Sequence, residues 1–194
     1  MLKGINSLGF KTPSPIQAQS IIPILKGRDV IGQAQTGTGK TAAFSIPMIE
    51  AINISERKVQ GLVLAPTREL AIQIADHIYK ISKFTGIRVT PIYGGQKINR
   101  QIRTLKSGVH IVVGTPGRII DHLERGTLKL KEVSMVVLDE ADRMLDMGFI
   151  KDINKILDRV PQNKQISLFS ATMDQNIWKI CNKYMNNPEK ILVS

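Results

Sequence analysis

The sequence is poor in cysteine and histidine, and this scarcity limits the kind of site that the chain can build. Cys181 is the only cysteine among 194 residues, so no internal disulfide can form. The three histidines, His77, His110 and His122, do not have the spacing of metal ligands. These counts exclude a metal site built from cysteine and histidine.

Long apolar stretches are also missing. No uninterrupted apolar run approaches the ~18 residues that a membrane-spanning helix needs, and the N-terminus lacks the apolar segment of a secretion signal. No segment combines dense lysine and arginine with large aromatic side chains, which weakens the case for a helix that lies on a membrane. We therefore expect a cytoplasmic protein with no membrane partner.

Negative charge is scarce relative to positive charge. The chain has 27 lysines and arginines against 16 aspartates and glutamates, a formal net charge of +11. A basic globular domain favours a polyanionic partner, nucleic acid first and an anionic membrane second. Composition alone does not choose between these partners, and a basic surface can also simply serve solubility.

Seven short apolar runs, each bounded by turn residues, are spread along the chain. They cover residues 29–32, 61–65, 88–92, 110–113, 135–138, 165–169 and 191–193. Continuous runs rich in β-branched residues are typical of strands buried on both faces of a parallel sheet. Pro91 interrupts one run and indicates an edge strand or an early end of that strand.

Helical patterns lie between these runs. Ser14 is a plausible N-cap for a helix that starts at Pro15 and closes at Gly27, and apolar side chains at 70, 74, 78 and 81 recur with helical spacing. Gly4 and Gly9 are expected to break the first ten residues. The alternation predicts an α/β fold: a doubly wound, mostly parallel sheet with helices on both faces. We expect one domain over residues 1–194, with a leading segment over 1–28 and the core over 29–194.

A glycine-rich loop follows the first predicted strand and leads into helix-like sequence. Its residues are Ala34, Gln35, Thr36, Gly37, Thr38, Gly39, Lys40 and Thr41. The two glycines let the backbone curl and aim successive N–H groups at phosphate oxygens. Lys40 is then expected to reach the β- and γ-phosphates, and the Thr41 hydroxyl to hold Mg²⁺. The general pattern begins with glycine, but Ala34 is small enough for the loop to form. The alternative is a glycine- and threonine-rich turn that contains a lysine by chance.

Polar clusters follow four of the other predicted strands, at residues 66–70, 115–118, 139–142 and 170–172. Open α/β sheets bind ligands beyond the carboxyl ends of their strands. The phosphate loop and these four clusters therefore predict one shared site, which makes a chance match of the loop less plausible.

The adjacent acids Asp139 and Glu140 supply the second half of a phosphate-loop enzyme. Asp139 is expected to bind Mg²⁺ through water, opposite Thr41, and Glu140 to orient the water that attacks the γ-phosphate. Lys40, the metal and backbone N–H groups would stabilise the developing charge. Adjacent acids alone more often just start a helix, but their position after a strand, downstream of a phosphate loop, favours catalysis.

Seven motifs, in order, resemble those of the DEAD-box ATP-dependent RNA helicases of superfamily 2. They are Gln17, the loop at 34–41, residues 66–70, Gly94 with Gly95, residues 115–118, residues 139–142 and residues 170–172. Asp142 separates the chain from the DEAH relatives, which carry histidine at that place. The match covers nearly the whole chain and is similar to the N-terminal RecA-like domain of these helicases, a P-loop NTPase fold.

The resemblance implies ATP and Mg²⁺ as cofactors and RNA as a partner. It implies that Phe10 stacks on adenine and that Gln17 hydrogen-bonds the edge of the base, with Thr12 in the same nucleotide-binding segment. It implies that Ser170 and Thr172 hydrogen-bond toward Asp142 and couple nucleotide state to RNA binding. Contacts to the RNA backbone, without sequence preference, are implied for Pro66, Thr67, Arg68, Gly94, Gly95, Thr115, Gly117 and Arg118. Arg100, Arg103 and Lys106 could extend this track, but a solvated helix face explains them better.

The resemblance also implies a second RecA-like domain, which supplies arginine fingers and the other half of the RNA clamp. The 194 residues contain no second set of phosphate-site motifs. We therefore expect the chain to bind ATP or ADP, to hydrolyse ATP slowly and not to unwind RNA by itself. Two alternatives stay open: a DNA-directed motor of the same superfamily, and a non-hydrolysing RNA-binding or scaffold module.

Overall fold

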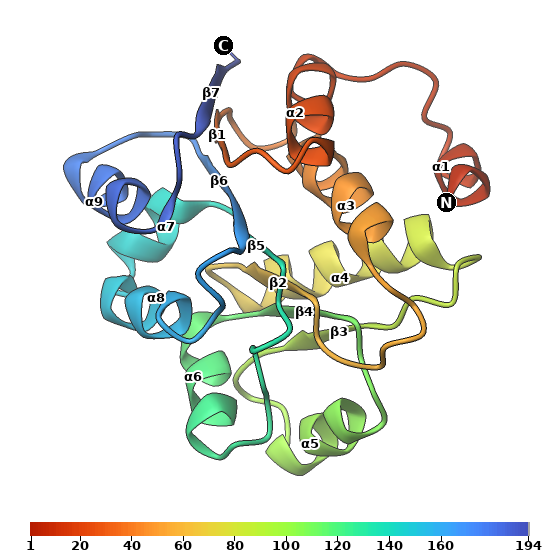
Figure 1. The fold of residues 1–194 in the computed structure, drawn as a ribbon, viewed down its shortest axis with the longest axis vertical. Coiled ribbons are helices and arrows are strands. Elements are labelled where there is room, and N and C mark those ends of the chain that lie inside the picture. Colours follow the sequence, from red (N-terminus) through yellow and green to blue (C-terminus); the bar gives the residue numbers. More distant parts are fainter. Residues whose placement is uncertain (194) are drawn as a thin grey trace.

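A computed structural model describes residues 1–193, which form nine helices and seven strands that alternate except where α1 precedes α2 and α7 precedes α8 (Figure 1). The helices are α1 (Leu2–Ser7), α2 (Pro15–Leu25), α3 (Lys40–Ala51), α4 (Arg68–Ser82), α5 (Ile98–Lys106), α6 (Pro116–Glu124), α7 (Ala141–Asp146), α8 (Ile150–Leu157) and α9 (Gln175–Tyr184). The strands are β1 (Val30–Gln33), β2 (Gly61–Leu64), β3 (Val89–Ile92), β4 (Ile111–Gly114), β5 (Met135–Leu138), β6 (Gln165–Ser170) and β7 (Glu189–Leu192).

The strands form one sheet in the order β3-β4-β2-β5-β6-β1-β7, and every neighbouring pair is parallel. Each strand falls on one of the seven apolar runs, with small displacements of its ends. Pro91 lies in β3, at one edge of the sheet, where a residue without an N–H leaves no ladder bond unmade on the open side. The predictions of seven strands and of an edge position for β3 are confirmed.

Alternate side chains of the strands pack into two apolar cores, one on each face of the sheet. In β2, Leu62 and Leu64 belong to one core and Val63 to the other. The first core also contains side chains of α6, α7, α8 and α9, and the second contains side chains of α2, α3 and α4. The doubly wound fold with helices on both faces is therefore confirmed, and its parallel strands direct all their carboxyl ends to one edge.

The N-terminal segment departs from expectation at Gly4. The sequence predicts a break there, but Gly4 lies inside α1 and is buried. A Cβ at this position would overlap the carbonyl oxygen of Ile81 in α4, so the glycine allows close packing of α1 on α4. Gly9, with φ of 74°, ends the segment in a turn as predicted. The sequence alone does not distinguish a glycine that interrupts a helix from one that lets two helices touch.

The helix that leads to the phosphate loop forms as predicted. Ser14 is the N-cap of α2, Pro15 is its first residue, and Gly27 follows its end with φ of 79°. In α4 the residues Ile74 and Ile78 are buried, as their helical spacing predicts. Within residues 1–193, no helix combines the length and apolar character needed to cross a membrane.

Candidate functional site

The phosphate loop connects the carboxyl end of β1 to α3, which begins at Lys40. Gly37 and Gly39 have φ of 80° and 95°, left-handed conformations that residues with a Cβ rarely adopt. The Lys40 ammonium donates to the carbonyl of Ala34 at 3.2 Å, and the Thr38 hydroxyl donates to the carbonyl of Gln35 at 2.8 Å. The loop is thus curled and internally bonded, as a phosphate cradle requires.

Lys40 and Asp139 form a buried pair of opposite charges. Their Nζ and Oδ1 atoms are 4.0 Å apart, and the side chains are only 6% and 4% exposed. The pKa of Asp139 is raised to about 6, mainly by burial. The nearby Lys40 lowers this pKa, and Glu140 adds to the increase. Because the carboxylate gives up most of its hydration here, a nearby cation stabilises it more than it would at the surface.

The oxygen donors near the loop fit Mg²⁺. Asp139 supplies a carboxylate and Thr41 a hydroxyl, and both line the same cavity. Hard oxygen ligands suit this ion, which keeps several waters and usually takes only one or two carboxylates plus substrate phosphates. Over residues 1–193, no group of three or more His, Cys, Asp or Glu side chains is arranged to hold a metal ion. Water and phosphate oxygens would therefore complete the shell.

Glu140 has an unusual backbone for a residue with a side chain. Its φ is 50°, and it is the N-cap of α7. Such a conformation costs about 1–3 kcal/mol and persists only where the surroundings hold it. The Glu140 carboxylate accepts from the Arg143 guanidinium at 3.2 Å and is only 14% exposed. The strained turn holds this acid at the mouth of the phosphate loop, next to Asp139.

The phosphate loop and the two acids share one cavity of about 380 Å³. The predicted residues that line it are Phe10, Gln17, Thr36, Gly37, Gly39, Lys40, Thr41, Asp139 and Glu140. The other predicted nucleotide-binding residues do not line the cavity. Thr12 is exposed. Ala34, Gln35 and Thr38 take part in the hydrogen bonds that hold the loop in its curled shape. The structure thus brings most of the predicted nucleotide site together.

Gln17 joins α2 to the phosphate loop. Its Oε1 accepts from the N–H of Ser14 at 2.9 Å, and its Nε2 donates to the carbonyl of Gly39 at 3.1 Å. The Ser14 hydroxyl donates to the carbonyl of Thr38 at 2.8 Å. Two hydrogen bonds, to the carbonyls of Thr38 and Gly39, therefore fix the start of α2 against the loop, and the bond between Ser14 and Gln17 holds the two donors together. The contact of Gln17 with adenine stays a prediction.

One face of α4 lines the cavity and was not predicted from the sequence. Leu70, Gln73 and His77 lie there, and the His77 ring meets the Phe10 ring edge-on with 6.0 Å between centroids. Burial lowers the pKa of His77, with Lys80 adding to the effect, so the ring is neutral at neutral pH. The sequence offers one signal for this face: the three residues are spaced by three and four along a helix that follows β2, so they lie on the same side of it.

Asp142, Ser170 and Thr172 lie in contact, as predicted. The Asp142 carboxylate accepts from the N–H of Thr172 at 3.0 Å and from its hydroxyl at 3.1 Å, and the N–H of Asp142 donates to the Ser170 hydroxyl at 3.2 Å. Burial raises the pKa of Asp142, but hydrogen bonds from Arg143, Thr172 and Ser170 outweigh burial and leave the pKa lowered. These bonds tie the turn after β5 to the turn after β6. The role of this contact in coupling stays a prediction.

The predicted RNA contacts come from the ends of three neighbouring strands, β3, β4 and β2. Thr67 and Thr115 are the N-caps of α4 and α6, and Gly94, Gly95, Gly117 and Arg68 are exposed. The Arg68 guanidinium lies 5.0 Å from the centroid of the Tyr93 ring, beside Gly95. Pro66 is buried. The arrangement offers backbone N–H groups and a cation along one edge, which suits phosphate contacts.

Arg118 is more enclosed than a surface cation. Its guanidinium donates to the carbonyl of Gln96 at 3.0 Å and to Oε1 of Gln101 at 3.2 Å. The same Oε1 accepts from Nε2 of His122 at 2.8 Å, and Nδ1 of His122 lies 2.8 Å from the Thr127 hydroxyl. Because Oε1 can only accept, the Nε2–H tautomer is assigned to His122. This buried network, which sequence reasoning missed, holds the turn after β3 next to the turn after β4.

Comparison with known proteins agrees with these features. Residues 14–180 match the family model "DEAD/DEAH box helicase". The chain is 58% identical, over its whole length, to "DEAD-box ATP-dependent RNA helicase CshA" of Geobacillus kaustophilus (strain HTA426), of which it covers 41%. It is 54% identical to the protein of that name from Bacillus subtilis (strain 168), of which it covers 39%. The chain thus spans about two fifths of the length of these relatives.

Two solved structures also match the chain over nearly its whole length. A DEAD box protein from the hyperthermophile Methanococcus jannaschii matches with a TM-score of 0.96 and 47% identity, over 100% of this chain and 53% of that one. A "hypothetical ATP-dependent RNA helicase" from Sulfolobus tokodaii matches with a TM-score of 0.91 and 38% identity, over 99% of this chain and 56% of that one. The resemblance inferred from the motifs and the RecA-like fold are therefore confirmed. The chain belongs to the DEAD/DEAH box helicase family.

Proposed function

We propose that the chain is the ATP-binding half of a DEAD-box ATP-dependent RNA helicase, equivalent to its N-terminal RecA-like domain. Residues 1–28 form the segment that holds the base, and residues 29–194 form the core. The observation that carries the proposal is the buried pair of Lys40 and Asp139 beside a curled glycine loop, in one cavity with Glu140. Such an enzyme acts where RNA is, and the cytoplasm is its expected location.

Each of these residues has its own role in the reaction with ATP. The loop N–H groups and Lys40 hold the phosphates, and the Thr41 hydroxyl with the Asp139 carboxylate holds Mg²⁺, which neutralises phosphoryl charge when bound. Glu140 orients the attacking water and accepts its proton. Its position one residue after Asp139, fixed by the left-handed turn, keeps the two carboxylates in one cavity but in separate roles.

The base is held at the other end of the cavity. Phe10 is 37% exposed there, so part of its ring is open for stacking on the base. Gln17 recognises adenine through its amide, which requires it to exchange a bond to Ser14 or Gly39 for one to the base. That exchange would link base recognition to the shape of the phosphate loop.

RNA lies along the edge formed by the turns after β2, β3 and β4, and its backbone is contacted by residues 66–68, 94–95 and 115–118. The hydrogen bonds between Asp142 and Thr172 join the turn after β5, which carries the acids, to the turn after β6, and are the proposed link between nucleotide state and RNA binding. A single arginine finger contributes about 10³–10⁵ in rate, so slow hydrolysis and no unwinding are expected until a C-terminal RecA-like domain supplies its residues.

Two other functions compete with this one. A DNA-directed motor would bind single-stranded DNA as well as RNA, and a non-hydrolysing scaffold would bind RNA without using nucleotide. The intact set of Lys40, Asp139 and Glu140 in one cavity argues against the scaffold. The names of the Geobacillus and Bacillus relatives, both RNA helicases, favour RNA.

Equilibrium binding tests the proposal. Fluorescent ADP with Mg²⁺ should bind the chain more tightly than the matching GDP, and Lys40→Ala should weaken this binding at least tenfold, about 1.4 kcal/mol. Lys155→Ala, on the exposed face of α8, is the matched control and should bind as the parent does. In the presence of a non-hydrolysable ATP analogue, oligo(U) should bind more tightly than oligo(dT). Equal affinity for ADP and GDP, or for the two strands, would contradict the proposed substrates.

A further inference from the structure

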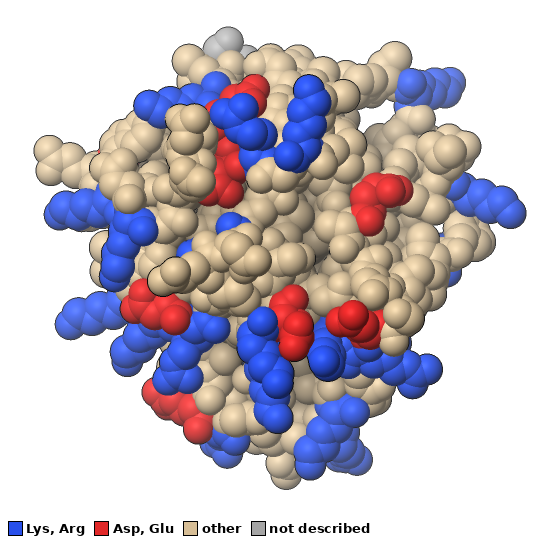
Figure 2. Space-filling view, in the orientation of Figure 1, with Lys and Arg blue, Asp and Glu red and all other residues tan. Residues whose placement is uncertain are grey.

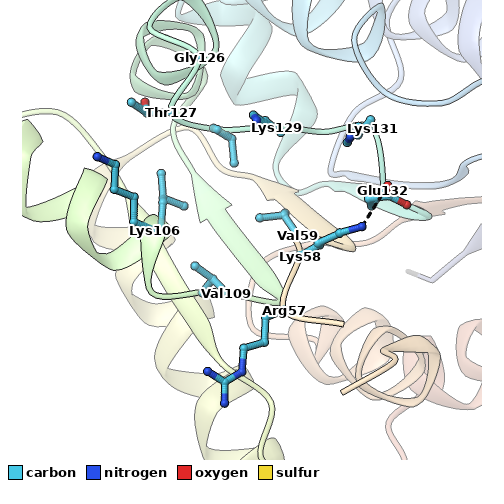
Figure 3. A pocket seen from close by; sticks show the side chains of 12 residues that line it. Arg57, Lys58, Val59, Lys106, Val109, Gly126, Thr127, Lys129, Lys131 and Glu132 are labelled. Carbon is cyan, nitrogen blue, oxygen red and sulfur yellow. Dashed lines mark ion pairs between the residues drawn. The ribbon is translucent and has the colours of Figure 1, made fainter. Parts of the chain in front are cut away.

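A second cavity, of about 440 Å³, lies at the end of the sheet opposite the nucleotide site (Figure 3). Three segments enclose it: the entry to β2, the end of α5 with the entry to β4, and the connection from α6 to β5. Gly108 and Gly126 make sharp turns here, with φ of 86° and 69°. A Cβ on Gly108 would lie 2.9 Å from Cβ of Arg57, so this glycine lets two of the segments approach closely.

The floor of this cavity is aliphatic. It consists of Val59, Leu105, Val109 and Leu128. Val59 and Leu128 belong to the apolar core beneath, and Leu105 packs against that core. Within the described chain, no aromatic side chain lines the cavity. An opening of this size over an aliphatic floor suits one or two large apolar side chains of a ligand, because burial of such a group contributes about 1.5–3 kcal/mol.

The rim of the cavity is basic. Arg57, Lys58, Lys106, Lys129 and Lys131 are exposed around it, against the single acid Glu132. Figure 3 shows Lys129 and Lys131 on the segment that crosses one side, and the one ion pair, between Lys58 and Glu132 at 3.7 Å. For the other four cations, no carboxylate lies within 4.0 Å among residues 1–193. Figure 2 shows many Lys and Arg side chains, with several Asp and Glu side chains between them, over the lower half of its view, where Figure 1 places α5 and α6.

The combination of floor and rim favours protein over nucleic acid as the ligand. Single-stranded RNA bound at a pocket stacks its bases on aromatic rings, and this pocket has none. An acidic peptide with an apolar side chain would match both parts, since its carboxylates meet the cations and its apolar group covers the floor. Rim charges mainly set the association rate and the choice of partner, while the buried group supplies affinity.

We propose that this cavity docks an acidic segment of a partner protein, anchored by one large apolar side chain. The site lies at the amino ends of the strands, whereas the nucleotide and RNA residues lie at the carboxyl ends, so the partner would leave both surfaces free. The inference does not depend on the proposed ATP and RNA chemistry. The excess of lysine and arginine around the cavity would then serve to recruit a partner protein.

The test uses a fluorescein-labelled synthetic peptide of alternating glutamate and serine with one central leucine, measured by anisotropy. Two matched peptides replace the leucine with serine or every glutamate with glutamine. The double variant Lys129→Glu/Lys131→Glu changes the rim, and Lys151→Glu/Lys179→Glu changes exposed lysines elsewhere by the same charge. Amide chemical shifts of Gly108 and Gly126 locate the bound peptide, with Gly37 as the reference at the phosphate loop.

The parent peptide should bind saturably and shift Gly108 and Gly126 but not Gly37. Each matched peptide should bind about tenfold more weakly, and the rim variant should weaken the parent peptide about fivefold, against less than twofold for the control variant. Several results would overturn the proposal: no saturable binding, equal affinity of the serine and leucine peptides, or equal losses in the two double variants. Displacement of the peptide by oligo(U) would instead assign the face to nucleic acid.

Discussion

Gly39→Ala probes the junction between α2 and the phosphate loop. Gly39 has φ of 95°, and a Cβ there would lie 2.6 Å from Nε2 of Gln17 and 2.8 Å from Oγ of Ser14. The left-handed backbone costs an alanine about 1–2 kcal/mol. Displacement of the two side chains breaks two hydrogen bonds, each worth about 0.5–1.5 kcal/mol. The expected loss of unfolding free energy is therefore about 2–5 kcal/mol, or a fall in Tm on the order of 10 °C.

Gly37→Ala is the matched control for this prediction. Gly37 lies in the same loop with φ of 80°, but a Cβ there would meet nothing within 4 Å, so only the backbone term remains. Urea denaturation of both variants should show Gly39→Ala less stable than Gly37→Ala by about 1–3 kcal/mol. When both variants also carry Gln17→Ala, this difference in unfolding free energy should become smaller. Equal losses in the two variants would refute the inference that Ser14 and Gln17 hold the loop.

Three further predictions concern the acids and the RNA edge. Because the pKa of Asp139 is raised to about 6, its protonated form is favoured below that pH, and affinity for ATP with Mg²⁺ should fall as pH drops through 6. Asp139→Asn should bind ATP weakly, and its affinity should depend less on pH. The same pH dependence in the parent and the variant would contradict the assignment of Asp139 to Mg²⁺. Asp142→Asn and Thr172→Ala should be non-additive in RNA-stimulated hydrolysis by the longer protein, with a coupling energy of about 1–3 kcal/mol; additive effects would show that their hydrogen bonds do not transmit the nucleotide state. Nη1 of Arg118 makes both bonds, to Gln96 and to Gln101. The lysine of Arg118→Lys carries its ammonium on a shorter side chain without the planar guanidinium, so this variant should weaken RNA binding severalfold and leave ADP binding unchanged. Unchanged RNA affinity would contradict the place of Arg118 in the edge.

The sheet could be predicted from the sequence because its signal is local. Strands buried on both faces need continuous apolar runs, and β2 and β5 are such runs, with all four residues of each buried. Pro91 marked the edge strand for an equally local reason, its missing N–H. The phosphate loop and the acids after β5 could be brought to one site because parallel strands place their carboxyl ends together.

Other features depend on contacts between segments distant in the chain, which no local pattern reports. Gly4 is a packing glycine only because Ile81 lies against it. His77 enters the nucleotide cavity because α4 lies beside the phosphate loop, and Gln101 becomes a hub because α6 brings Arg118 and His122 to it. The basic cavity at the other end of the sheet likewise combines three segments that carry no common motif.

The rate of ATP hydrolysis tests whether the chain is one half of a two-domain enzyme. It should be measured for this chain and for the same chain with its natural downstream sequence, each with and without single-stranded RNA. We expect slow, RNA-insensitive hydrolysis by the chain alone and RNA-stimulated hydrolysis by the longer protein, faster by about 10³ or more if an arginine finger is supplied. Equal RNA-stimulated activity in both would contradict the claim that the chain is one half of a two-domain enzyme.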